Sequence, residues 1–195
     1  MTRLNSMATV VAAGFILTAG TLLEGRVQAR RADARLFIGD LTVAGLGEVQ
    51  LGQLASERAA SPDVKAFGQM MVKDHSAANG ELSKLASQMK IEPPKEADKA
   101  HKELASRLST LHGAEFDRAY IAAMVQGHRD VADSLRTWLK ESRPLGEPPP
   151  GDPKAKDAAS GGPQEEALTA WAKKTLPVVE KHLERAQDLQ GKLGE

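Results

Sequence analysis

The sequence predicts an all-α protein built around four long helices. Its 195 residues are enough for one domain with a buried core. Apolar residues recur at helical spacing in four long segments, and the alternation that indicates strands is nearly absent. Helices with an apolar stripe bury that stripe against one another, so this pattern predicts a four-helix bundle.

We expect the first long helix at about residues 33–60. Ser61 and Pro62 then start the second, because serine is a favoured N-cap residue and proline suits the first helical position. This helix should end near residue 90, shortly before two consecutive prolines.

A shorter helix is expected at about residues 95–111, followed by long helices at 114–141 and 164–190. An extra helix that crosses the bundle between the second and third long helices suits a topology with one long crossover. The predicted architecture is therefore a ferritin-like four-helix bundle, with a plain up-and-down bundle as the alternative. The bundle would span residues 33–190, including a loop at 143–163 that is rich in proline and glycine.

Residues 1–29 have the pattern of a signal peptide. Arg3 precedes an apolar stretch at 7–23, and Val27-Gln28-Ala29 supplies a small-residue cleavage site. An uncleaved N-terminal membrane anchor is the alternative reading. The pattern predicts a periplasmic protein with no integral membrane span after cleavage, and it leaves open an association with the outer membrane.

Charge and cysteine content exclude several classes of function. Cleavage would remove Arg3, Arg26 and Glu24, leaving 24 basic and 25 acidic residues. A nearly neutral chain offers no strong field for nucleic acid, so no nucleic-acid partner is expected. With no cysteine, the chain has neither a thiolate metal ligand nor a cysteine nucleophile. A protein partner cannot be named from the sequence.

Each predicted long helix carries one polar residue on its otherwise apolar face. These residues are Glu48, His75, His128 and His182. Glu48, His75 and His128 lie within about one residue, or ~1.5 Å of rise, of the midpoints of their helices, so they should meet at one level. His182 is offset by ~7 Å along its helix, and Pro177 should kink that helix nearby.

Three histidines and one glutamate at a common level could hold one metal ion. Imidazole suits Zn, Fe or Cu, and a carboxylate can complete the coordination shell. The same groups could instead form a closed hydrogen-bonded network without a cofactor. Copper(I) is a further possibility, because Met71 and Met124 each precede a histidine by four residues and add soft thioether ligands.

Two observations limit the chemistry. Di-iron bundles need a Glu-x-x-His motif on two helices, and here valine stands three residues before each candidate histidine, at Val72, Val125 and Val179. We also find no phosphate-binding glycine loop and no nucleophile constellation. The sequence therefore favours a binding protein over an enzyme. The competing hypothesis is an envelope stress or interaction protein with a buried polar network.

Several blocks of the sequence resemble one family. LGEVQLGQLASERAASPDVKAFGQMMVKDHSAAN, AEFDRAYIAAMVQGH and KKTLPVVEKHL are similar to the bacterial domain-of-unknown-function 4142 family across residues 33–190. Its members are grouped with ferritin-like folds and are often labelled outer membrane proteins. The resemblance implies that Glu48, His75, His128 and His182 are recurring family positions, with Asp74 and Asp117 beside them. It implies no established activity.

Overall fold

The computed structural model describes residues 18–142 and 162–194, and the regular structure within them is helical. Helix α1 spans Thr18–Arg58, α2 Pro62–Gln88, α3 Lys99–Ser109, α4 Gly113–Glu141 and α6 Pro163–Gly194. The predicted all-α bundle is confirmed. The predicted loop at 143–163 lies almost entirely outside the described residues.

Helix α1 begins earlier than the expected residue 33. It already includes Thr18, the first residue that the structure describes, and no proline interrupts the segment between Thr18 and Asp33. The predicted cleavage site after Ala29 falls inside this helix, and the signal peptide stays a prediction. None of the described helices is both long enough and apolar enough to cross a membrane.

Helix α2 starts at Pro62 as predicted, but its cap comes from another helix. The side chain of Ser61 makes no capping hydrogen bond. Instead, the buried carboxylate of Asp117 on α4 accepts hydrogen bonds from the backbone N–H groups of Ala60 at 3.0 Å and Ser61 at 2.7 Å. Asp117 therefore ties the turn between α1 and α2 to α4.

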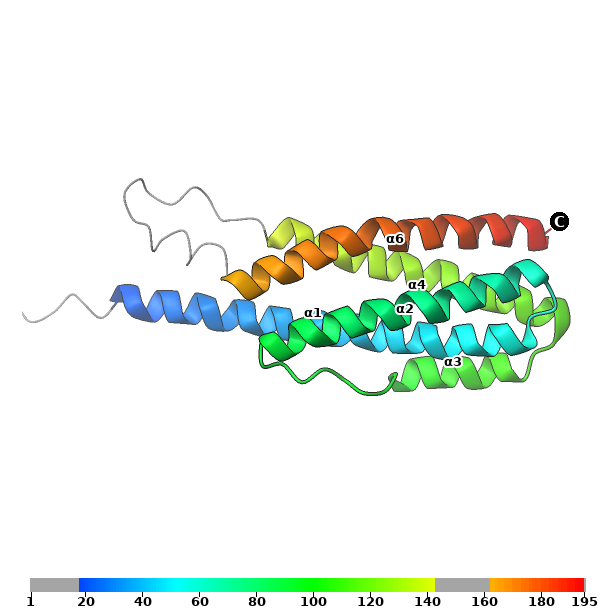
Figure 1. The fold of residues 1–195 in the computed structure, drawn as a ribbon, viewed down its shortest axis with the longest axis horizontal. Coiled ribbons are helices and arrows are strands. Elements are labelled where there is room, and N and C mark those ends of the chain that lie inside the picture. Colours follow the sequence, from blue (N-terminus) through cyan, green and yellow to red (C-terminus); the bar gives the residue numbers. More distant parts are fainter. Residues whose placement is uncertain (1–17, 143–161, 195) are drawn as a thin grey trace, which may run out of the picture.

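The short helix α3 is present between α2 and α4, and it is shorter than the predicted 95–111. It begins after Asp98, whose side chain accepts a hydrogen bond from the backbone N–H of His101 and so caps the helix there. In Figure 1, α3 lies alongside α1 on the outside of the long helices. The structure does not confirm that this helix crosses the bundle.

The four long helices form two antiparallel pairs. Helix α1 packs mainly on α2, and α4 packs mainly on α6. The segment 89–98 and α3 carry the chain back along the bundle, so α2 and α4 run in the same direction (Figure 1). This connection runs along the bundle, and the ferritin-like topology stays a prediction.

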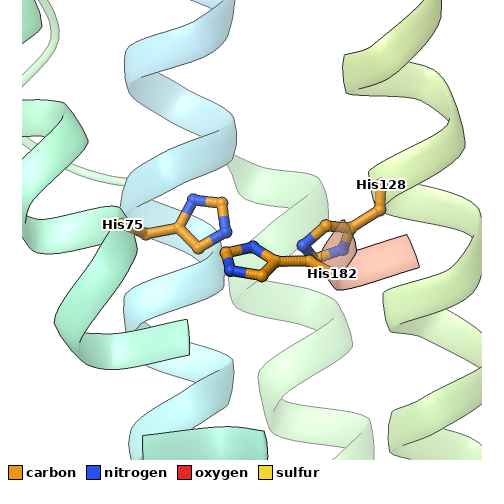
Figure 2. Close-up of side chains that lie close together, drawn as sticks. All are labelled: His75, His128 and His182. Carbon is orange, nitrogen blue, oxygen red and sulfur yellow. The ribbon is translucent and has the colours of Figure 1, made fainter. Parts of the chain in front are cut away.

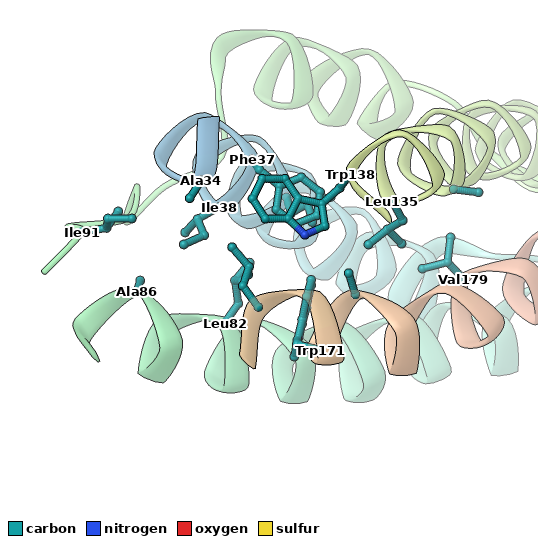
Figure 3. Close-up of a cluster of buried hydrophobic side chains, with 14 residues drawn as sticks. Ala34, Phe37, Ile38, Leu82, Ala86, Ile91, Leu135, Trp138, Trp171 and Val179 are labelled. Carbon is teal, nitrogen blue, oxygen red and sulfur yellow. The ribbon is translucent and has the colours of Figure 1, made fainter. Parts of the chain in front are cut away.

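The buried apolar residues fall into two separate clusters rather than one continuous core. The first is rich in aromatic and leucine side chains from one end of the bundle, and it is shown in Figure 3. The second occupies the other end and contains the buried methionines. Representative members are Phe37, Leu135, Trp138 and Trp171 in the first cluster, and Phe67, Met71, Tyr120 and Met124 in the second. The predicted polar residues lie between these clusters along the helices.

The helical spacing of Leu168, Trp171 and Val178 in the sequence predicts that Val178 faces inward, but it points outward. Val178 is 43% exposed, and Val179 takes its place in the core at 3%. Counting turns of about 3.6 residues from Leu168 reaches position 178.8 on the third turn, which is nearer to Val179. Helix α6 continues through Pro177, so the proline does not end it.

The contact between α1 and α2 depends on glycine. A Cβ atom on Gly52 would lie 2.7 Å from the backbone oxygen of Gly68, and one on Gly68 would lie 2.8 Å from the Cβ of Ala55. These separations are too short for side chains, so glycine at both positions allows the two backbones to approach closely. Gly80, on the same helix α2, has no atom within 4 Å of an added Cβ.

We expect Gly52→Ala and Gly80→Ala to change stability in opposite directions. Alanine at Gly52 forces the α1 and α2 backbones apart and should lower the free energy of unfolding by about 1–3 kcal/mol. Alanine at Gly80 meets open space and should raise it by about 0.4–1 kcal/mol, because helical alanine loses less backbone entropy on folding. Urea unfolding of both variants measures this, and a stabilised Gly52→Ala would contradict the close contact.

Candidate metal centre

Four polar side chains from four helices lie between the two apolar clusters. Glu48 comes from α1, His75 from α2, His128 from α4 and His182 from α6. Glu48 is 5% exposed, His128 1% and His182 4%, while His75 is partly buried. Helices α4 and α6 each bury a second ionisable side chain as well, Asp117 and Glu165.

The three histidines form a nearly regular triangle. Their ring centroids are 5.5 Å apart for His75 and His128, 5.6 Å for His75 and His182, and 5.5 Å for His128 and His182. One nitrogen from each ring lies within 4.8 Å of the other two. Figure 2 shows the rings converging from three helices. His182, expected to be offset from the others, belongs to the group.

A backbone carbonyl determines which nitrogen of His128 carries the proton. Its Nδ1 lies 2.8 Å from the carbonyl oxygen of Met124. A carbonyl oxygen only accepts hydrogen bonds, so Nδ1–H is the donor. In the neutral ring, Nε2 then holds a free lone pair, and this atom is buried without a partner among the described residues.

For His182, a carboxylate determines which ring nitrogen carries the proton. Nε2 of His182 lies 3.1 Å from Oδ2 of Asp74, so Nε2–H donates to the carboxylate. Nδ1 then holds the lone pair, and it too is buried with no partner in the described part of the chain. A histidine that donates one N–H to a carboxylate and offers its other nitrogen is the usual arrangement of a metal ligand.

The third histidine also offers a buried nitrogen. Nε2 of His75 has no hydrogen-bond partner within residues 18–142 and 162–194. Buried polar atoms are nearly always paired, and each one left unpaired costs about 1–3 kcal/mol. Three neighbouring rings that each have such a nitrogen could therefore hold a metal ion.

The histidines are held in the neutral form that a metal requires. Burial lowers the pKa of His75 to about 3, assisted by repulsion from His128 and His182. Burial also lowers the pKa of His128 to about 4, against the raising effect of its bond to Met124. The pKa of His182 is lowered by burial, opposed by Asp74. Neutral imidazoles keep the lone pairs free at neutral pH.

Glu48 lies next to the triangle rather than within it. Its Oε1 is 3.7 Å from Nδ1 of His128, which is the nitrogen that already donates to Met124. Its Oε2 is buried and unpartnered among the described residues. Burial raises the pKa of Glu48 to about 8, so the side chain is neutral at pH 7. Glu48 as a direct metal ligand stays a prediction.

The distances between the histidine nitrogens are close to those in a site that binds a divalent ion. Zinc–nitrogen bonds of about 2.0–2.1 Å place tetrahedral ligand nitrogens about 3.4 Å apart. The histidine nitrogens lie within 4.8 Å of one another. Each ring would have to move inward by less than about 1 Å, which small side-chain rotations can supply.

The role of Asp74 differs from what the sequence suggested. Asp74 directly precedes His75 on helix α2, and this position in the sequence suggests either a partner that orients His75 or a solvated residue. The structure shows that it crosses to His182 on α6. Adjacent residues on a helix point about 100° apart, so Asp74 faces the neighbouring helix, whose identity only the tertiary arrangement supplies.

We expect Glu48→Gln to change how stability depends on pH. Glu48 titrates near 4.5 when unfolded and near 8 when buried. Between these values the folded state keeps a proton that the unfolded chain loses, so stability falls as pH rises. Relative to Glu48→Gln, the wild type should lose at least about 1 kcal/mol between about pH 5 and about pH 8.

Urea unfolding of chelator-treated protein at both pH values measures this difference. Both proteins share the titration of the histidines, which therefore largely cancels in the comparison. A constant difference across the range would contradict a buried neutral carboxyl group.

The comparison with known proteins gives a family and no activity. The family described as a domain of unknown function, DUF4142, matches residues 24–143. This range contains Glu48, His75 and His128, and it ends before helix α6 and His182. Neither a curated protein nor a solved structure matches the chain. Because the match covers more than half of the sequence, the chain belongs to the DUF4142 family.

Proposed function

We propose that this protein binds one divalent metal ion in the middle of its bundle, through His75, His128 and His182. The observation that supports this most directly is the set of three buried imidazole nitrogens without partners. Two of them have their lone pairs oriented by hydrogen bonds on the opposite side of the ring. This combination of neutral rings and fixed tautomers is what metal ligation needs.

A closed polar network without a cofactor has less support. Such a network would pair Glu48 with a protonated histidine. The pKa of His128 is lowered to about 4 and that of Glu48 is raised to about 8, so neither is charged at neutral pH. In addition, one ring nitrogen of each histidine has no hydrogen-bond partner among the described residues, so the network is incomplete there.

Zinc is the first ion to test. Imidazole ligands suit zinc, iron and copper alike, but zinc readily takes three histidines and one further ligand in a tetrahedral shell. Copper(I) is the alternative that the methionines favour. Met71 and Met124 are buried one turn before His75 and His128. Both methionines also belong to the second apolar cluster, where methionine commonly serves to fill the core. The proposed setting is the periplasm, on the strength of the signal-peptide pattern at residues 1–29.

Metal content is the decisive measurement. We expect the purified protein, after incubation with zinc and dialysis, to retain about one ion per chain, as a three-ligand site predicts. A variant combining His75→Gln, His128→Gln and His182→Gln should retain none, while His112→Gln should match the wild type because His112 lies exposed at the start of α4. Equal zinc content in the triple variant would overturn the proposal.

Zinc should also raise the unfolding temperature of the wild type and of His112→Gln. An ion that binds only the folded state adds about 2.7 kcal/mol of stability at 100 times its dissociation constant. The triple variant should show no zinc-dependent shift, and circular dichroism of that variant confirms whether it is folded. This readout does not depend on the completeness of dialysis.

We expect Asp74→Asn to weaken zinc binding by about 10- to 100-fold without unfolding the protein. Asparagine keeps the size of the side chain but loses the charge that holds the N–H of His182. Asp188→Asn, which changes an exposed residue near the C-terminal end of α6, is the matched control. Competition titration with a zinc chelator measures both affinities, and equal values would exclude a role for the Asp74–His182 contact.

A further inference from the structure

A small cavity adjoins the histidine triangle on one side. It has a volume of about 50 Å³, and its walls include His75 and His182 but not His128. Most of the remaining wall is apolar, with contributions from α1, α2, α4 and α6. The exposed Val178 and the partly exposed Asp74 also line it, so the cavity lies near the surface between α2 and α6.

Small residues one helical turn from the histidine level create this space. Ala44 and Gly45 precede Glu48 by four and three residues on α1, and Ala78 follows His75 by three on α2. Gly45 has no room for a side chain of its own, because an added Cβ would overlap the amide of Asn79. The cavity therefore remains open beside the short side chains of Ala44 and Ala78.

The opposite side of the histidine level is filled. Met71 and Met124 lie one turn before His75 and His128, and both are almost completely inaccessible. The ring of Phe67 lies 6.4 Å from that of His128, and it too is buried. Among the described residues, these side chains block that side of the triangle, whereas the cavity offers a ligand an approach to it.

We propose that a metal ion held by the three histidines keeps one coordination position open toward this cavity, where it takes a small anion of two or three heavy atoms. This inference rests on the proposed function. Three neutral imidazoles leave the charge of a divalent ion uncompensated, which favours an anionic fourth ligand. Peroxide, with two heavy atoms, and azide, with three, belong to this class.

The size and polarity of the cavity define what fits. A cavity of about 50 Å³ has room for more than one water molecule, so it admits a short linear ligand. Trp171 stands in the wall, and its Nε1–H is buried without a partner among the described residues. An indole N–H is a donor only, so it suits the neighbourhood of an anion.

Azide binding to the cobalt(II)-loaded protein tests this inference. Cobalt(II) replaces zinc and has visible absorption that changes when a ligand enters its coordination shell. We expect azide to change the spectrum of the wild type saturably. Ala78→Val adds two methyl groups inside the cavity and should weaken azide binding at least about tenfold while cobalt remains bound.

Two further variants keep the test interpretable. Ala44→Val fills the same cavity from α1 and should act like Ala78→Val. Ala123→Val adds the same groups on α4, where the alanine packs on the second apolar cluster outside the cavity, and it should bind azide like the wild type. Cobalt content and helicity are measured for each variant. If Ala78→Val fails to fold or to hold cobalt, Ala44→Val provides the same comparison.

The outcomes separate this inference from the proposed function. No cobalt binding by the wild type overturns both. Cobalt binding without a spectral response to azide overturns only the open position. Equal azide affinity in the wild type, Ala44→Val and Ala78→Val overturns the assignment of the ligand to the cavity, as does loss of cobalt from both filled variants.

Discussion

The structure depends on one unusual constraint: a layer of polar side chains is buried across the middle of an apolar bundle. Three imidazoles and one carboxyl group interrupt the core and divide it into two clusters. Desolvation keeps all four groups neutral at pH 7 and leaves ring nitrogens of the three histidines without partners. Such a layer destabilises the fold unless something fills it, because unpaired buried atoms lose their hydration.

The helices around the layer position it from both sides. Close packing of α1 on α2 through Gly52 and Gly68 holds Glu48 and His75 at neighbouring heights. Asp117 connects the α1–α2 turn to α4, and Asp74 connects α2 to α6 through His182. Each of these two carboxylates accepts a hydrogen bond from a group outside its own helix. These bonds favour one register of the helices, and the bond from Asp74 also orients the ring of His182.

The two sides of the polar layer are packed differently. Bulky methionine and phenylalanine side chains close one side, while alanine and glycine leave a cavity on the other. Sequence inspection could identify Ala44, Gly45 and Ala78 as small, but small residues in helices are common and usually allow close packing. Whether they produce contact or empty space depends on which side chains face them. At Gly45 the result is contact with Asn79, and beside Ala78 it is a cavity.

The sequence by itself determined the all-α bundle, the approximate helices and the histidines that face inward, because helical periodicity and capping are local properties. It placed Val178 in the core instead of Val179, since two residues at adjacent positions fit the same coarse pattern. Only the tertiary structure decided that His182 joins the triangle, that Asp74 bonds to it and that Glu48 stands beside it. These features depend on the rotation and axial register of one helix against another, and no local pattern encodes them.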